Sequence, residues 1–132
     1  MSASFDTNIV IYAFTAGPKQ AAARNVLAGG GVISAQVLNE FVNVMRKKRG
    51  AAWSDIDDAL RVILTHFPDV IPITKEINAA ALALARDHSF AFYDALIVAA
   101  ASEAGCDTLY SEDMQHGRSI GSLAIVNPFV GA

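Results

Sequence analysis

Short apolar runs alternate with helical patterns along this chain, and no other feature constrains its fold as strongly. We expect strands at about residues 2–6, 32–33, 70–73, 108–111 and 123–126. Helical patterns fill most of the segments between them. Strands separated by helices predict an α/β fold, with a mainly parallel sheet and helices on both of its faces.

Capping residues and apolar spacing indicate where the helices lie. Ser34 is a typical N-cap for residues 35–48, whose apolar side chains recur at the spacing of one buried helix face. Thr74 caps a later helix in the same way. Further helices are expected over about 18–27, 54–66 and 93–104, and a helical turn after Asp6. The helix expected over about 93–104 contains ALIVAAA, which has no polar side, so we expect this helix to be buried.

The composition fits one globular domain covering residues 1–132. Hydrophobic residues make up 53% of the chain and charged residues 17%, which argues against disorder. The longest apolar runs, 79–85 and 95–101, are too short to cross a bilayer, and the N-terminus lacks the pattern of a secretory signal. Cys106 is the only cysteine, which excludes an internal disulfide and fits a reducing cytoplasm. We therefore expect a cytoplasmic protein without a membrane anchor.

Four acidic residues lie within, or at the end of, strongly apolar segments: Asp6, Glu40, Asp94 and Asp113. A buried carboxylate without a partner costs several kcal/mol, and few Lys or Arg residues lie beside these positions. Hard cations such as Mg²⁺ and Mn²⁺ prefer carboxylate and water ligands, and the chain has no Cys/His spacing typical of zinc. Together the four acids suggest a metal site that hydrolyses phosphodiesters.

Each acid also has a simpler explanation when it is considered alone. Asp6 can cap the helix that follows it, and Asp94 can be stabilised by the start of its own helix. Glu40 lies at the border of an apolar stripe, where solvent can reach it. Asp113 has a competitor for its role in Glu112, which lies in the same loop.

The chain has one basic cluster, formed by Arg46, Lys47, Lys48 and Arg49. These side chains either complement the negative end of their helix or bind phosphate. The net charge of −3 does not indicate nucleic-acid binding, but a local patch can differ from the average.

Four segments, in this order, resemble the PIN domain: FDTNIVIYAF, ISAQVLNEFVNVMRKK, FYDALIVAAA and LYSEDMQHG. They are most similar to the VapC-type toxins of bacterial toxin–antitoxin pairs. The resemblance runs from Phe5 to about Gly117, nearly the whole chain. It implies a three-layer α/β/α fold and an endoribonuclease that depends on Mg²⁺ or Mn²⁺.

The resemblance also implies roles for individual residues. Asp6, Asp94 and Asp113 would bind the metal directly or through water, while Glu40 would complete the cluster and orient or deprotonate the attacking water. Three polar residues would support them: Thr7, Asn8 and Ser111. Glu112 leaves the identity of the fourth acid open. Many relatives have Trp before the third acid, where this chain has Tyr93.

The resemblance further implies an RNA substrate, a small antitoxin partner and a homodimer. It makes the basic cluster a contact for the RNA backbone. Three aromatic residues, Trp53, Phe92 and Tyr93, would line a groove for the partner or, as is more usual at such spacings, pack in the core.

Two other functions remain open from the sequence. A haloacid-dehalogenase-type phosphatase also uses an Asp after a strand, but it has a second acid two residues later, where this chain has Asn8. A PIN module without catalytic activity would bind RNA or protein only. The presence of all four acids argues against it.

Overall fold

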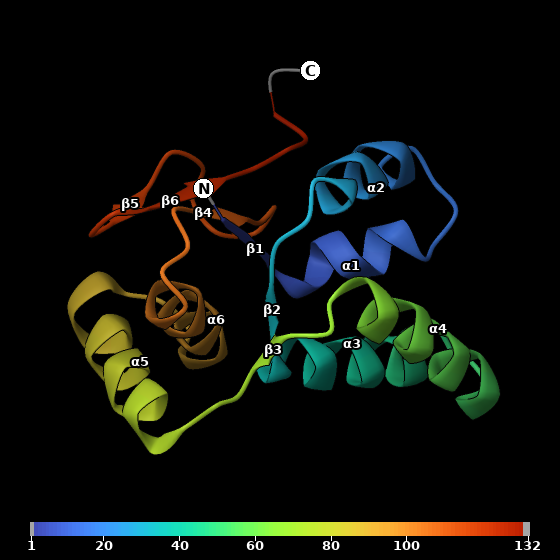
Figure 1. The fold of residues 1–132 in the computed structure, drawn as a ribbon, viewed down its shortest axis with the longest axis horizontal. Helices are drawn as coiled ribbons and strands as arrows, with labels where there is room; N and C mark the ends of the chain where they lie inside the picture. The colour runs from blue at the N-terminus through green and yellow to red at the C-terminus, as the bar shows by residue number, and fades with distance from the viewer. Residues whose placement is uncertain (1, 131–132) are drawn as a thin grey trace.

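The computed structural model describes residues 2–130 (Figure 1). Its strands are β1 (Ala3–Phe5), β2 (Ile33–Ser34), β3 (Val70–Ile71), β4 (Thr108–Tyr110), β5 (Ser119–Ile120) and β6 (Leu123–Val126). Its helices are α1 (Thr7–Ala13), α2 (Gln20–Ala28), α3 (Ala35–Lys47), α4 (Trp53–His66), α5 (Lys75–His88) and α6 (Phe92–Glu103).

The sheet is mainly parallel, as the sequence predicts. Strand β4 lies between β1 and β6 and pairs parallel with both, while β5 pairs antiparallel with β6 at the edge. Strands β2 and β3 form a second parallel pair, which a bridge between Ser4 and Val32 joins to β1. Helices α5 and α6 lie on one side of the strands and α1 to α4 on the other, which gives three layers (Figure 1).

The predicted elements are present, with small shifts at their ends. The strand predicted at 70–73 ends at Ile71, because Pro72 has no N–H to extend a ladder. The helical turn expected after Asp6 is a full helix of 7 residues, α1. The prediction missed β5, a strand of 2 residues that is too short to show an alternating pattern.

Helix α6 is buried as expected, since every residue from Ala95 to Ala101 is at most 4% exposed. Around it and the sheet lie the largest fully buried side chains, including Phe5, Phe41, Ile97 and Leu109. Within the part of the chain that the structure describes, no helix is both long and apolar enough to span a membrane.

The strand register decides which residues meet at the edge of the sheet. Phe5 and Tyr110 are the last residues of two adjacent parallel strands and pair with each other. Asp6 and Ser111 therefore leave the sheet side by side. In open α/β sheets, binding sites lie beyond the carboxyl ends of the strands, and this is the edge at which Asp6 and Ser111 lie.

Candidate active site

Asp6 lies between β1 and α1, directly after the last residue of the strand and directly before the first residue of the helix. It is the N-cap of α1, and its Oδ1 accepts a hydrogen bond of 2.7 Å from the backbone N–H of Thr7. Its Oδ2 accepts a second one, also of 2.7 Å, from Ser111 Oγ. Asp6 is only 4% exposed. The capping explanation is therefore correct, and the same carboxylate is also buried at the sheet edge.

Burial raises the pKa of Asp6 to about 7. The hydrogen bonds from Ser111 and Thr7 lower this pKa, while the nearby charges of Asp94 and Glu40 raise it further. Among residues 2–130, none of the four predicted acids forms a salt bridge with Lys or Arg. The site thus favours the neutral form of Asp6, and a bound cation would stabilise the charged form instead.

Glu40 faces α1 from the second turn of α3. Thr7 Oγ1 donates to its Oε1 at 2.8 Å, and Gln36 Nε2 donates to its Oε2 at 3.0 Å. The side chain is half-buried and oriented, so it is not the freely solvated residue of the simpler explanation. Gln36 was not among the residues predicted from the sequence, although its spacing of four residues from Glu40 on a helix is the signal that points to it.

Asp94 lies in the first turn of α6, where the start of the helix favours a negative charge. The N-cap of α6 is Ala91, however, and no side chain caps this helix. Asp94 therefore lies where the simpler explanation places it, at the start of its helix, but it does not cap that helix. Burial raises the pKa of Asp94, and the charges of Glu40 and Asp113 raise it further.

Asp113 and Glu112 point in different directions. Asn8 Nδ2 donates to Asp113 Oδ2 at 2.9 Å and, more weakly, to Asp6 Oδ2 at 3.5 Å, so Asp113 joins the acid cluster. Glu112 instead pairs with Lys19 and accepts a hydrogen bond from Tyr12. Burial would raise the pKa of Glu112, but the hydrogen bonds from Lys19 and Tyr12 outweigh it and lower that pKa.

The loop that carries Asp113 is fixed from both sides. Ser111 Oγ, which donates to Asp6, also accepts the backbone N–H of Met114 at 3.2 Å. On the other side, Asn8 Oδ1 accepts the backbone N–H of Glu112 at 3.3 Å. Ser111 and Asn8 thus hold the loop against the start of α1.

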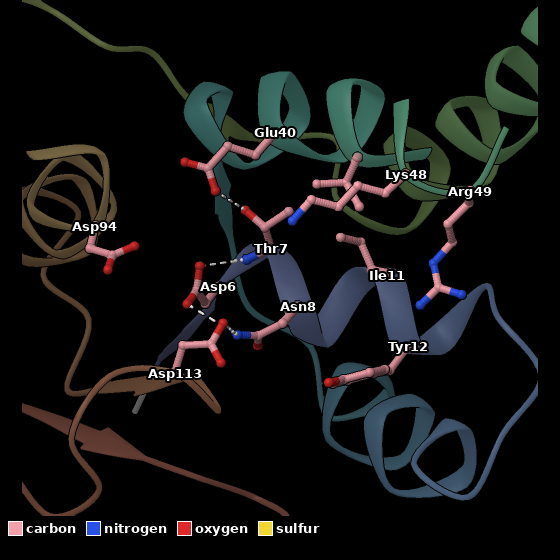
Figure 2. A pocket seen from close by; sticks show the side chains of 11 residues that line it. Asp6, Thr7, Asn8, Ile11, Tyr12, Glu40, Lys48, Arg49, Asp94 and Asp113 are labelled. Carbon is pink, nitrogen blue, oxygen red and sulfur yellow. Dashed lines mark hydrogen bonds between the residues drawn. The ribbon is translucent and has the colours of Figure 1, made fainter. Parts of the chain in front are cut away.

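The four acids face one pocket of about 250 Å³ (Figure 2). They come from four separate segments: the end of β1, helix α3, helix α6 and the loop after β4. The pocket is lined by Asp6, Thr7, Asn8, Ile11, Tyr12, Glu40, Val44, Lys48, Arg49, Asp94 and Asp113. The structure therefore brings together all four acids predicted from the sequence.

The predicted basic cluster divides into two parts. Lys48 and Arg49 line the acid pocket (Figure 2). Arg46 lies with its guanidinium 4.5 Å from the centre of the Trp53 ring and donates to the carbonyl of Ala51. Lys47 is exposed and does not line the pocket.

The aromatic residues expected in the core are on the surface instead. Trp53 is 60% exposed, Tyr93 63% and Phe92 37%, so the core explanation is wrong for all three. They occupy the first two positions of α6 and the first position of α4.

The donor set fits a hard divalent cation held partly through water. Within residues 2–130, no three Asp, Glu, His or Cys side chains lie close enough to bind one ion together. Mg²⁺ does not require this, because it keeps several water ligands and commonly takes only one or two carboxylates. Four acids without basic partners around one pocket supply that kind of site.

A PIN domain profile matches residues 4–118 of the chain. No curated protein matches it by sequence. A toxin–antitoxin complex from Klebsiella pneumoniae has a similar chain, with a TM-score of 0.74, 27% identity and coverage of 97% of this chain and 98% of that one.

Two further solved structures share the fold. One is the Mycobacterium tuberculosis toxin VapC20, which cleaves the sarcin–ricin loop: its TM-score is 0.72 at 22% identity, over 85% of this chain and 90% of that one. The other is VapBC2 from Rickettsia felis bound to a promoter DNA fragment, with a TM-score of 0.69 at 19% identity, over 95% of this chain and 97% of that one.

Proposed function

The chain belongs to the PIN domain family, and from this premise we propose that it is a metal-dependent endoribonuclease, the toxin of a toxin–antitoxin pair. The observation that carries the proposal is the acid pocket: four carboxylates face one space, and the most buried of them, Asp6, has a pKa of about 7. The similar structures support the toxin assignment, since one is a toxin that cleaves the sarcin–ricin loop.

The metal of this proposal is Mg²⁺ or Mn²⁺, held by Asp6, Asp94 and Asp113 directly or through water. When bound, such an ion lowers the pKa of water and stabilises charge on a phosphodiester. Ser111 and Asn8 donate to Asp6 and Asp113, and these hydrogen bonds keep the two carboxylates turned into the pocket.

Glu40 is the residue that we assign to the attacking water. Each of its oxygens accepts one hydrogen bond, from Thr7 and Gln36, so its orientation is fixed while further lone pairs remain free. From this position it accepts a hydrogen bond from water and takes up its proton. Lys48 and Arg49, on the same pocket, bind the phosphates of the RNA backbone.

The proposed partners are an RNA substrate, a cognate antitoxin and a second copy of this chain. Two of the similar structures are toxin–antitoxin assemblies, which supports the antitoxin. We place the activity in the cytoplasm, where RNA and antitoxin are both made. The haloacid-dehalogenase alternative finds no support at the site, because the position two residues after Asp6 is an amide that donates to Asp6 and Asp113.

The test compares wild type with Asp6→Asn on total RNA, with Mg²⁺, with Mn²⁺ and with EDTA. Asp57→Asn serves as the matched control, because Asp57 is an exposed carboxylate on α4 paired with Arg61. We expect wild type and Asp57→Asn to cleave RNA only with metal, and Asp6→Asn to lose cleavage. Equal cleavage by wild type and Asp6→Asn would sink the mechanism, and RNA binding without any cleavage would favour the non-catalytic module.

A further inference from the structure

A second groove opens directly beside the acid pocket. It has a volume of about 550 Å³, within the range of roughly 300–1,000 Å³ that is common for ligand sites. It is lined by Gln36, Asn39, Glu40, Asn43, Val44, Lys48 and Tyr93. Three of these residues, Glu40, Val44 and Lys48, also line the acid pocket, so the two hollows are adjacent.

Side-chain amides dominate one wall of this groove. Gln36, Asn39 and Asn43 follow one another at spacings of three and four residues along α3, which places them on one face of the helix. Asn39 and Asn43 are both exposed. An amide offers a donor and an acceptor side by side, which is the pattern that reads the edge of a nucleobase.

Tyr93 forms the other wall. It stands in the first turn of α6, immediately before Asp94, and is 63% exposed. The Phe92 ring meets it edge-on, with 5.9 Å between the ring centres. An exposed aromatic ring beside a phosphate site is the usual platform on which an unpaired base stacks.

We propose that this groove binds one unpaired nucleobase of the RNA, next to the phosphate that lies at the acids. The base stacks on Tyr93, and its edge meets the amides of Asn39 and Asn43. Lys48 lies where the two hollows join and contacts the backbone between the base and the acids. The inference rests on the proposed function and adds a base-binding groove beside its acid pocket.

Base recognition can be separated from catalysis by measuring binding alone. The probes are a short fluorescent single-stranded RNA and the same RNA with one base removed at successive positions, in EDTA so that no cleavage occurs. The variants are Tyr93→Ala, Tyr93→Phe, which keeps a ring, and Asn43→Ala. Trp53→Ala is the matched control, an exposed aromatic residue that does not line the groove.

We expect Tyr93→Ala to weaken binding of the intact RNA by about 5- to 100-fold, the usual contribution of one stacked base. Tyr93→Phe and Trp53→Ala should bind the RNA as tightly as wild type does. Asn43→Ala should weaken binding of the intact RNA but not of the RNA that lacks the recognised base. Removing the base at one position of the RNA should weaken binding by wild type but not binding by Tyr93→Ala.

The inference would be overturned if Tyr93→Ala lost the same affinity for the intact RNA and for every abasic RNA. It would also be overturned if Tyr93→Ala bound the intact RNA as tightly as wild type. Neither result depends on cleavage. A wild type that binds RNA through this groove but never cleaves it would refute the proposed ribonuclease and leave the base site standing.

Discussion

Asp6 combines two tasks that proteins usually assign to different residues. One of its oxygens caps α1 and the other accepts from Ser111, yet the carboxylate is almost completely buried beside two further acids. A cap favours the charged form, whereas burial and neighbouring acids favour the neutral one. Burial prevails, and the pKa of Asp6 rises from an ordinary 3.8 to about 7.

This shift makes the metal-free protein less stable as the pH rises. Between pH 4 and 7 the folded state keeps a proton on Asp6 that the unfolded state releases, so the free energy of unfolding falls across this window and levels off above it. The loss is up to roughly 4 kcal/mol, at about 1.36 kcal/mol per pKa unit. Urea unfolding in EDTA at several pH values measures it.

Asp6→Asn is the control for this prediction, because Asn is also a good N-cap but does not titrate. From pH 5 to pH 8, the free energy of unfolding of wild type should fall relative to that of the variant. A difference that stays constant over this range would contradict the assigned shift.

At the residue scale, the sequence is sufficient to predict which acids meet but not how each one is held. Asp6, Glu40 and Asp94 stand out because each interrupts an apolar segment. The choice between Glu112 and Asp113 cannot be made this way, because side chains of adjacent loop residues point in directions that only the loop geometry decides. The groove beside the pocket escaped prediction for a related reason, since exposed amides on a helix look like an ordinary solvated face.

At the scale of elements, the loop after β4 is held by contacts from three directions. Glu112 pairs with Lys19, whose ammonium group lies 5.0 Å from the centre of the Tyr12 ring and 5.4 Å from that of Phe129. The Tyr12 and Phe129 rings meet edge-on. Glu112 thus anchors the loop to α1 and to the segment after β6, while its neighbour Asp113 reaches the acid pocket.

Replacing each of the two acids by its amide should show which one anchors the loop and which one takes part in RNA cleavage. We expect Glu112→Gln to lower stability by about 0.5–1 kcal/mol, as for a partly exposed ion pair, and to keep cleavage within about tenfold of wild type. Asp113→Asn should leave stability nearly unchanged but lose more cleavage than the roughly 10- to 100-fold typical of losing a supporting partner. Thermal unfolding and RNA cleavage of both variants show which substitution costs more stability and which costs more cleavage. If Glu112→Gln lost more cleavage and Asp113→Asn more stability, Glu112 would be the fourth acid.

The helices and the parallel strands are predictable because capping residues and apolar spacing are local signals. Ser34 and Thr74 cap α3 and α5 as expected, each by accepting a backbone N–H three residues later. The basic cluster is not predictable as a unit, because α3 ends within it, at Lys47. Beyond a helix end the direction of each side chain depends on the following turn, and here Lys48 and Arg49 line the same pocket as the acids.

At the scale of the whole molecule, the two parts of the sheet meet at a crowded point. The backbone N–H of Val32 donates to the carbonyl of Ala3 at 2.9 Å, which brings the chain before β2 against β1. Gly31 has a φ of +143°, and a Cβ there would lie 2.3 Å from the carbonyl oxygen of Ala3 and 2.9 Å from the Phe5 ring. Only glycine fits this contact without displacing a strand.

Gly31→Ala should therefore destabilise the protein more than Gly30→Ala. Gly30 also has a positive φ, of +83°, but a Cβ there would meet nothing within 4 Å, so its substitution carries mainly the backbone cost of about 1–2 kcal/mol. The overlap at Gly31 should add about 1–3 kcal/mol. Urea unfolding of both variants measures the difference, and equal stabilities would mean that β1 and β2 can move apart freely.

The order in which the site residues occur along the chain has a consequence for the protein's synthesis. Ser111 and Asp113 are translated more than a hundred residues after Asp6. Strand β1 has no partner β4 until then, and the loop that completes the pocket does not exist. A growing chain that has not yet added this loop therefore lacks the complete pocket to which we assign RNA cleavage, while it is still surrounded by the ribosome and its message.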